Sequence, residues 1–72
     1  MELVLNHKYR VKPGCVASVW NEWEAEMEPL LPGTEVKLVG VENGEAQVQY
    51  EHLDLEEMYL EVKDLLELFE PC

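Results

Sequence analysis

Basic residues are scarce in this chain: of its 72 residues, five are Lys or Arg and sixteen are Asp or Glu, which gives a formal net charge of −11. Binding to nucleic acid through a basic face needs clustered Lys and Arg, and binding to an anionic lipid surface also needs positive charge. The composition therefore predicts no direct contact with nucleic acid and none with a membrane. Hydrophobic residues still make up 47% of the chain, which is more than a disordered acidic tail contains. We expect a single small acidic domain over residues 1–72.

Long apolar runs and cysteines are also few. The opening segment Met1–Asn6 has an acid at its second position and a short apolar run, so it predicts no secretory signal peptide. No window is long enough in apolar residues to span a membrane. The two cysteines, Cys15 and Cys72, are expected to be reduced thiols, because disulfides belong to secreted proteins. These features together predict a cytoplasmic protein.

Motifs for catalysis and for metal binding are absent as well. The sequence has no Ser-His-Asp order, no phosphate-binding glycine loop and no calcium loop, and its histidines and cysteines lack the spacing of zinc ligands. A chain this short also has little volume left for a pocket once its core is packed. We therefore predict a protein that is not an enzyme and that uses no cofactor and no metal.

The clearest local feature is a β-hairpin around Asn43-Gly44, a dipeptide favoured in two-residue turns. Alternating apolar residues flank this turn on both sides. A regular ladder would leave Val36 and Leu38 facing polar residues of the second strand. We therefore predict a β-bulge near Gly40, which returns both side chains to the apolar face of the hairpin.

Residues 15–30 carry apolar side chains at helical spacing, and their Glu, Ala and Met residues are good helix formers. A competing strand interpretation rests on glutamates that alternate with Trp23, Ala25 and Met27. We favour the helix because its apolar stripe is the longer pattern. This interpretation places Trp20, Trp23 and Met27 in the core. The alternative is an exposed stripe that binds a partner, because aromatic residues and Met are enriched at interfaces.

Residues 54–69 carry the strongest helical pattern, with Asp54 and Glu57 at the spacing of a capping box and an apolar stripe along one face. The long helix leaves Leu60 on its polar face. Residues 58–62 also alternate, so a strand followed by a single helical turn is an open alternative that houses Leu60 better.

A further strand is expected over residues 7–12, where basic and apolar residues alternate before Pro13-Gly14. The order of elements is then strand, helix, strand, strand, helix. This order predicts an α+β fold (β-α-β-β-α): a small antiparallel sheet with a tight hairpin at Asn43-Gly44 and two amphipathic helices on one face. The alternative is a small SH3-like β-barrel.

The excess of acid is the feature that departs most from an ordinary surface, because a net charge of about 2–8 suffices to keep a small domain soluble. A solvated acidic face accounts for part of it. The sharper hypothesis is a surface that meets a basic protein, since charge complementarity raises association rate and specificity. The residues expected to bind the partner are Glu56, Glu57, Glu61, Asp64 and Glu67, with Glu22, Glu24, Glu26 and Glu28 as a second patch.

We therefore predict a non-enzymatic acidic protein-binding module. One form of it is a DNA-mimic inhibitor of a basic nucleic-acid-binding protein, because small size, acidity and lack of catalytic motifs are typical of inhibitors that phages encode. The alternative is a structural or assembly subunit that binds itself or a larger complex through apolar surface. Leu60 and Leu68, which the long helix leaves on its acidic face, would be the contacts of that subunit and of a homo-oligomer.

Overall fold

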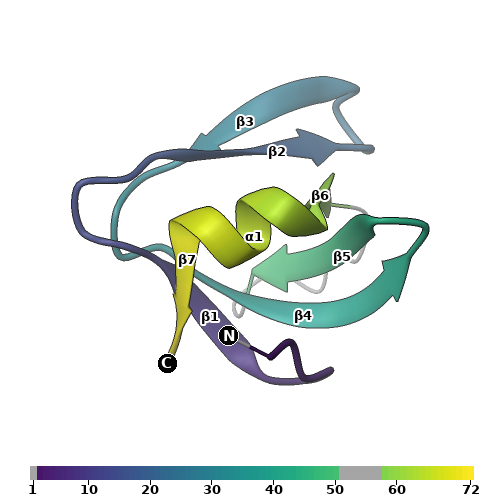
Figure 1. The fold of residues 1–72 in the computed structure, drawn as a ribbon. Helices are drawn as coiled ribbons and strands as arrows, with labels where there is room; N and C mark the ends of the chain where they lie inside the picture. Colours follow the sequence, from purple (N-terminus) through teal and green to yellow (C-terminus); the bar gives the residue numbers. More distant parts are fainter. Residues whose placement is uncertain (1, 51–57) are drawn as a thin grey trace.

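The computed structural model describes residues 2–50 and 58–72. In this part of the chain, strands dominate and one short helix occurs (Figure 1). In chain order the elements are β1 (Lys8–Val11), β2 (Ala17–Asn21), β3 (Glu26–Leu30), β4 (Glu35–Glu42), β5 (Glu45–Tyr50), β6 (Met58–Glu61), α1 (Val62–Leu68) and β7 (Phe69–Pro71).

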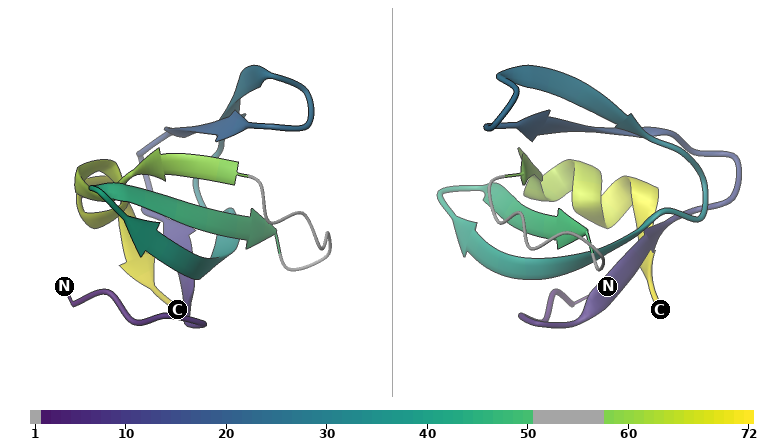
Figure 2. Two further views of the ribbon diagram at one scale, coloured as in Figure 1. Left: turned by 90° about the vertical axis from the view of Figure 1, so that its right-hand side faces the viewer. Right: turned by 180° about the vertical axis from the view of Figure 1, so that it is seen from behind.

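The described strands form one antiparallel sheet in the order β3-β2-β6-β5-β4-β1-β7. The sheet curves strongly around its inner face, as the two views of Figure 2 show. Helix α1 carries the chain from β6, in the middle of the sheet, to β7 at its edge. The curvature gives the sheet a concave face that holds the core and a convex face that meets solvent.

Alternation along the strands decides which side chains face the core. In β2 every second residue is buried, and in β6 Met58 and Leu60 are buried whereas Tyr59 is half-buried. Leu65 is the buried residue of α1, and it packs into the same cluster. The buried apolar residues are Tyr9, Val11, Ala17, Val19, Leu30, Val36, Leu38, Ala46, Val48, Met58, Leu60, Leu65 and Phe69.

The predicted hairpin at Asn43-Gly44 is confirmed, and so is its bulge. Both turn residues have positive φ, 51° at Asn43 and 79° at Gly44, as a turn of type I′ requires. The β4–β5 register shifts between Leu38 and Gly40, so that Leu38 lies opposite Val48. The extra residue in β4 thus returns its apolar side chains to the core face.

The helix predicted over residues 15–30 is wrong, because this segment is the β2–β3 hairpin. The side-chain oxygen of Asn21 accepts hydrogen bonds from the backbone N–H groups of Trp23 (2.9 Å) and Glu24 (3.2 Å). These bonds fold the chain back on itself, and Ala25 completes the turn with a φ of 51°. The alternation that supported the competing strand interpretation is therefore the pattern that the fold uses.

Asn21→Ala is expected to lower the free energy of unfolding by about 1 kcal/mol, because it removes the acceptor of both turn bonds. Urea unfolding followed by circular dichroism measures the change. Ser18→Ala is the matched control, since Ser18 is exposed on the same strand. Equal stability of the two variants would contradict the structural role of Asn21.

The long helix predicted over residues 54–69 is also wrong in its described part. Residues 58–61 form β6, and the helix is confined to Val62–Leu68. The physical reason is that β6 pairs with both β2 and β5, which buries Leu60 in the core instead of leaving it on a polar helix face. The predicted capping residues Asp54 and Glu57 lie outside the described residues.

These two corrections overturn the β-α-β-β-α fold with two helices on one face of the sheet. The structure is mostly antiparallel sheet with one short helix in its described part. The SH3-like barrel, with a strand at 58–62 and one turn of helix after it, is loosely compatible with this arrangement. Within the same described ranges, no helix is long and apolar enough to cross a membrane.

Candidate functional site

The acids predicted to form a first patch do not share one helix face. Glu61 is exposed at the end of β6, and Asp64 is half-buried in the first turn of α1. Glu67 is exposed near the other end of α1, where its backbone carbonyl accepts a hydrogen bond from Lys12 Nζ at 3.2 Å. Glu56 and Glu57 lie outside the described residues.

The second predicted patch, Glu22, Glu24, Glu26 and Glu28, is carried by the β2–β3 hairpin and its turn. Glu28 is half-buried and accepts a hydrogen bond from Asn21 Nδ2 at 2.8 Å, so part of its function is structural. A hydrogen bond with Glu26, followed by the negative charges of Glu26 and Glu28, raises the pKa of Glu24 above its ordinary value. Three of the four carboxylates, those of Glu24, Glu26 and Glu28, are therefore close enough to interact.

The raised pKa of Glu24 predicts a pH dependence of stability. The folded chain binds this proton more tightly than the unfolded chain, so Glu24 contributes stability below the ordinary Glu pKa of 4.5 and loses that contribution as the pH rises through the raised value. Glu24→Gln, which mimics the protonated form, is expected to raise the melting temperature at about pH 7 and to have little effect near pH 4. Thermal unfolding of both proteins across this range measures the difference. A difference that does not change with pH would contradict the predicted sign.

A set of acids that the sequence did not single out lies on the convex face. The strand register places Glu42 of β4 opposite Glu45 of β5, and Glu45 opposite Glu61 of β6. All three side chains are exposed. We call Glu42, Glu45 and Glu61 the acidic row. Neighbouring strands are about 4.8 Å apart, so these like charges lie side by side across three strands.

A row of mostly apolar side chains lies next to the acidic row. Met27 of β3 lies opposite Trp20 of β2, and Trp20 lies opposite Tyr59 of β6. Met27 and Trp20 are 58% and 37% exposed, and Trp23 in the adjoining turn is 68% exposed. The prediction that Trp20, Trp23 and Met27 form a core is therefore wrong. We call Met27, Trp20 and Tyr59 the apolar row.

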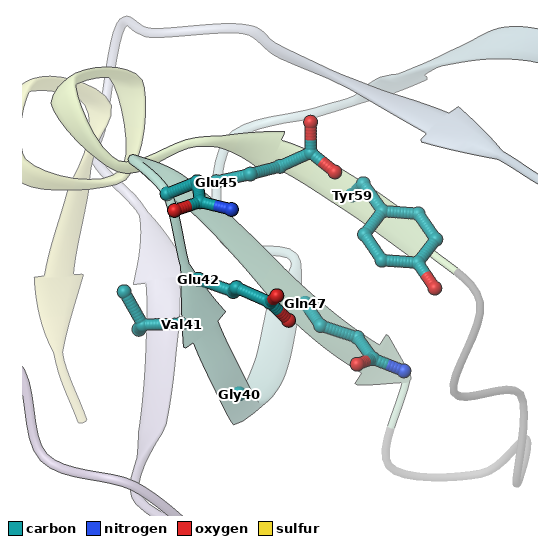
Figure 3. Close-up of a pocket in the computed structure, with 7 residues that line it drawn as sticks. Gly40, Val41, Glu42, Glu45, Gln47 and Tyr59 are labelled. Carbon is teal, nitrogen blue, oxygen red and sulfur yellow. The ribbon is translucent and has the colours of Figure 1, made fainter.

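Two open depressions meet at Glu45 and Tyr59, which line both. The first, about 410 Å³, lies beside the Asn43-Gly44 turn. Figure 3 shows Glu45 extending toward Tyr59, with Gln47 farther along the same strand and Glu42 on β4. The second, about 600 Å³, lies between the apolar row and the start of α1. We call the second one the aromatic depression. Its described lining residues are Ser18, Trp20, Glu22, Met27, Glu45, Tyr59, Leu60, Glu61 and Asp64.

Arg10 of the first strand and Lys12 just after it lie elsewhere and donate hydrogen bonds to the chain's own oxygens. Arg10 Nε is 2.8 Å from Glu70 Oε2, and this hydrogen bond and ion pair raise the pKa of Arg10. The pairing follows from register, since Arg10 of β1 lies opposite Glu70 of β7. None of the described residues that line the two depressions is Lys or Arg. The exposed side chain of Lys63 lies beside the acidic row, with its Nζ 3.6 Å from Glu61 Oε2.

Carboxylates and aromatic rings are among the side chains that line the two depressions. No group of three or more His, Cys, Asp or Glu side chains that could hold a metal ion occurs in the part of the chain that the structure describes. Both cysteines are free thiols. Leu60, a predicted contact of the assembly alternative, is 5% exposed, and Leu68 packs in part against the core. Those two leucines therefore do not form an apolar docking patch.

Comparisons with protein-family models, with curated proteins and with solved structures found no match for this chain. The functional argument therefore depends on the geometry of the convex face.

Sequence reasoning found Glu61 and Asp64 of this face but missed Glu42, Glu45 and Tyr59. The pairing of Glu42 with Glu45 can be predicted from the sequence, because these two residues flank the Asn43-Gly44 turn. Residues that flank a two-residue turn lie opposite each other. The position of Tyr59 depends on how β6 pairs with β2 and β5, which no local pattern specifies.

Proposed function

We propose that this chain is a non-enzymatic protein-binding module whose convex sheet face binds a basic partner protein. The observation that supports it is the acidic row, Glu42, Glu45 and Glu61, which runs beside exposed apolar side chains. Like charges placed directly opposite each other in a sheet destabilise it. Glu61 has Lys63 of the same chain 3.6 Å away, and we infer that a basic partner supplies the complement for Glu42 and Glu45.

The distribution of positive charge supports the same proposal. Arg10 is held by Glu70, and Lys12 by the carbonyl of Glu67. These contacts hold two of the five basic side chains at the β1–β7 edge, away from the acidic row. An uneven charge distribution of this kind steers a positively charged protein toward one face and orients it on arrival. A cytoplasmic location is part of the proposal, and the two free thiols are consistent with it.

The test compares two variants of equal net charge. Glu45→Gln/Glu61→Gln neutralises two positions of the acidic row, whereas Glu2→Gln/Glu67→Gln neutralises two exposed acids outside it. Immobilised wild-type chain and both variants are exposed to the same cell extract at low salt, and retained proteins are identified by mass spectrometry. A basic protein retained by the wild type and by the Glu2/Glu67 control, but lost from the Glu45/Glu61 variant, supports the proposal. Equal retention by both variants would show that only net charge matters and would overturn it.

A narrower form of this proposal is DNA mimicry, in which the carboxylates occupy the phosphate-binding groove of a nucleic-acid-binding protein. The test is competition: the chain displaces a labelled duplex from the partner, and the Glu45/Glu61 variant does so at least about tenfold less well. A partner that binds the chain and the duplex at the same time would exclude mimicry and leave the binding module in place.

A second candidate function, self-association, is favoured by a different observation. Several large apolar side chains in and beside the β2–β3 hairpin are exposed: Val16, Trp20, Trp23, Met27 and Leu31. Apolar patches of this kind are typical of protein interfaces. Light scattering distinguishes the two functions, because an apolar dimer persists at about 0.5 M salt, where charge interactions are screened within a few ångströms. A monomer at high protein concentration and high salt would remove this candidate.

A further inference from the structure

We propose that the aromatic depression receives an arginine side chain of the basic partner. This inference rests on the proposed function, and it adds the chemical group that the convex face recognises. The arginine would bind at one subsite, whereas the acidic row attracts the basic partner as a whole.

The apolar row supplies flat aromatic surface for such a side chain. Trp20 and Tyr59 lie opposite each other on neighbouring strands, and both line the depression. Trp20 Nε1 donates a hydrogen bond to Glu22 Oε2 at 2.5 Å, which satisfies the indole N–H and fixes a carboxylate beside the ring. With its N–H already paired, the indole can still attract a cation through the electron-rich face of its ring.

The carboxylates of the depression supply the matching charge. Glu22, Glu45, Glu61 and Asp64 line it, on β2–β3, β5, β6 and α1. Lys63 is paired with Glu61 of this set, and its 75% exposed side chain can be displaced from Glu61 without leaving a buried charge. Aromatic faces surrounded by acids suit a group that is both flat and positive.

Among protein side chains, arginine fits this description better than lysine. The guanidinium group is planar, stacks on aromatic rings and pairs with carboxylates through two parallel hydrogen bonds. The ammonium group of lysine is a compact and strongly hydrated charge, so its contact with a ring face costs more desolvation, and it can neither stack on the ring nor pair with a carboxylate through a planar fork. The depression, about 600 Å³ and open to solvent, has room for one such side chain and its water.

The experiment uses two synthetic peptides of equal length and charge, one with arginine and one with lysine as its basic residue. Binding to the full chain is measured by calorimetry at low salt. We expect the arginine peptide to bind the wild type about tenfold more tightly than the lysine peptide. Trp20→Leu is expected to abolish this preference. Trp23→Leu is the matched control, since Trp23 is more exposed than Trp20 and does not line the depression.

The outcomes separate this inference from the proposed function. Equal affinity for the two peptides, or a preference for arginine that survives Trp20→Leu in a chain shown to be folded by circular dichroism, would overturn the arginine subsite. Failure of the arginine peptide to bind would overturn it as well. A preference lost in Trp20→Leu and kept in Trp23→Leu supports it. The proposed function fails on a different result, which is binding of basic proteins that does not depend on Glu45 and Glu61.

Discussion

Phe69→Ala is expected to lower the free energy of unfolding by about 3–5 kcal/mol, which is a large part of the stability of a domain of this size. Phe69 is 1% exposed and follows α1 directly, at the first position of β7. Its backbone pairs with Val11 of β1, so the side chain holds the end of the chain against the core. Removing the ring leaves a cavity at the point where helix, edge strand and core meet.

Denaturant unfolding measures this change, and Leu66→Ala provides the matched control. Leu66 lies on α1 three residues before Phe69 but is 40% exposed. We expect the control to cost less than about 1 kcal/mol, because little apolar area is lost from the core. Similar losses in the two variants would show that Phe69 does not close the core as described.

Glu45→Lys is expected to stabilise the chain by about 1–2 kcal/mol and to raise its melting temperature by several degrees. Glu45 lies between Glu42 and Glu61, so the substitution turns two repulsive cross-strand pairs into two attractive ones. The same substitution is expected to weaken the binding of a basic partner at low salt. A gain in stability together with a loss of binding is the behaviour of a site that is maintained for function.

Thermal unfolding at low and at about 0.5 M salt checks this prediction, because the gain is electrostatic and shrinks when charges are screened. Glu2→Lys is the control, as it makes the same change of charge at an exposed position outside the acidic row and outside any helix or strand. If Glu2→Lys raised the melting temperature as much as Glu45→Lys, the effect would come from net charge, and the acidic row would not destabilise the fold.

The part of the fold that could be predicted from sequence is the part determined by local chemistry. Asn43-Gly44 favours positive φ at two successive residues, and the alternation beside it was regular enough to reveal the bulge near Gly40. The strand at residues 8–11 is also predicted by its local pattern, because Lys8 and Arg10 alternate with two residues that are buried in the core.

The β2–β3 hairpin was misread because its residues satisfy two patterns at once. Val19 and Leu30 belong to the helical stripe and also face the core from two strands. Two interactions favour the hairpin over the helix. The Asn21 side chain stabilises the turn, and β2 pairs with β6, which is distant in sequence. Helix propensity is weak beside such tertiary contacts.

The sequence predicted an acidic surface, but it did not predict the arrangement of the acids that the structure shows. Acidity pointed to a basic partner, and that remains the proposal. The acidic row exists because β5 lies between β4 and β6, so that Glu45 has a glutamate on each side. Sequence alone could pair Glu45 with Glu42 across the turn. It could not pair Glu45 with Glu61, because that register is established by long-range packing of Met58 and Leu60.

The measurement that tests the account most directly is a titration of isotopically labelled chain with the arginine peptide, followed by amide and indole NMR shifts. The account predicts that the largest shifts fall on the convex face, at Trp20, Glu45, Tyr59 and Glu61, and that the Trp20 indole N–H moves with them. Shifts confined to α1 and the β1–β7 edge, or spread evenly over every exposed glutamate, would contradict the claim that this face is the binding surface.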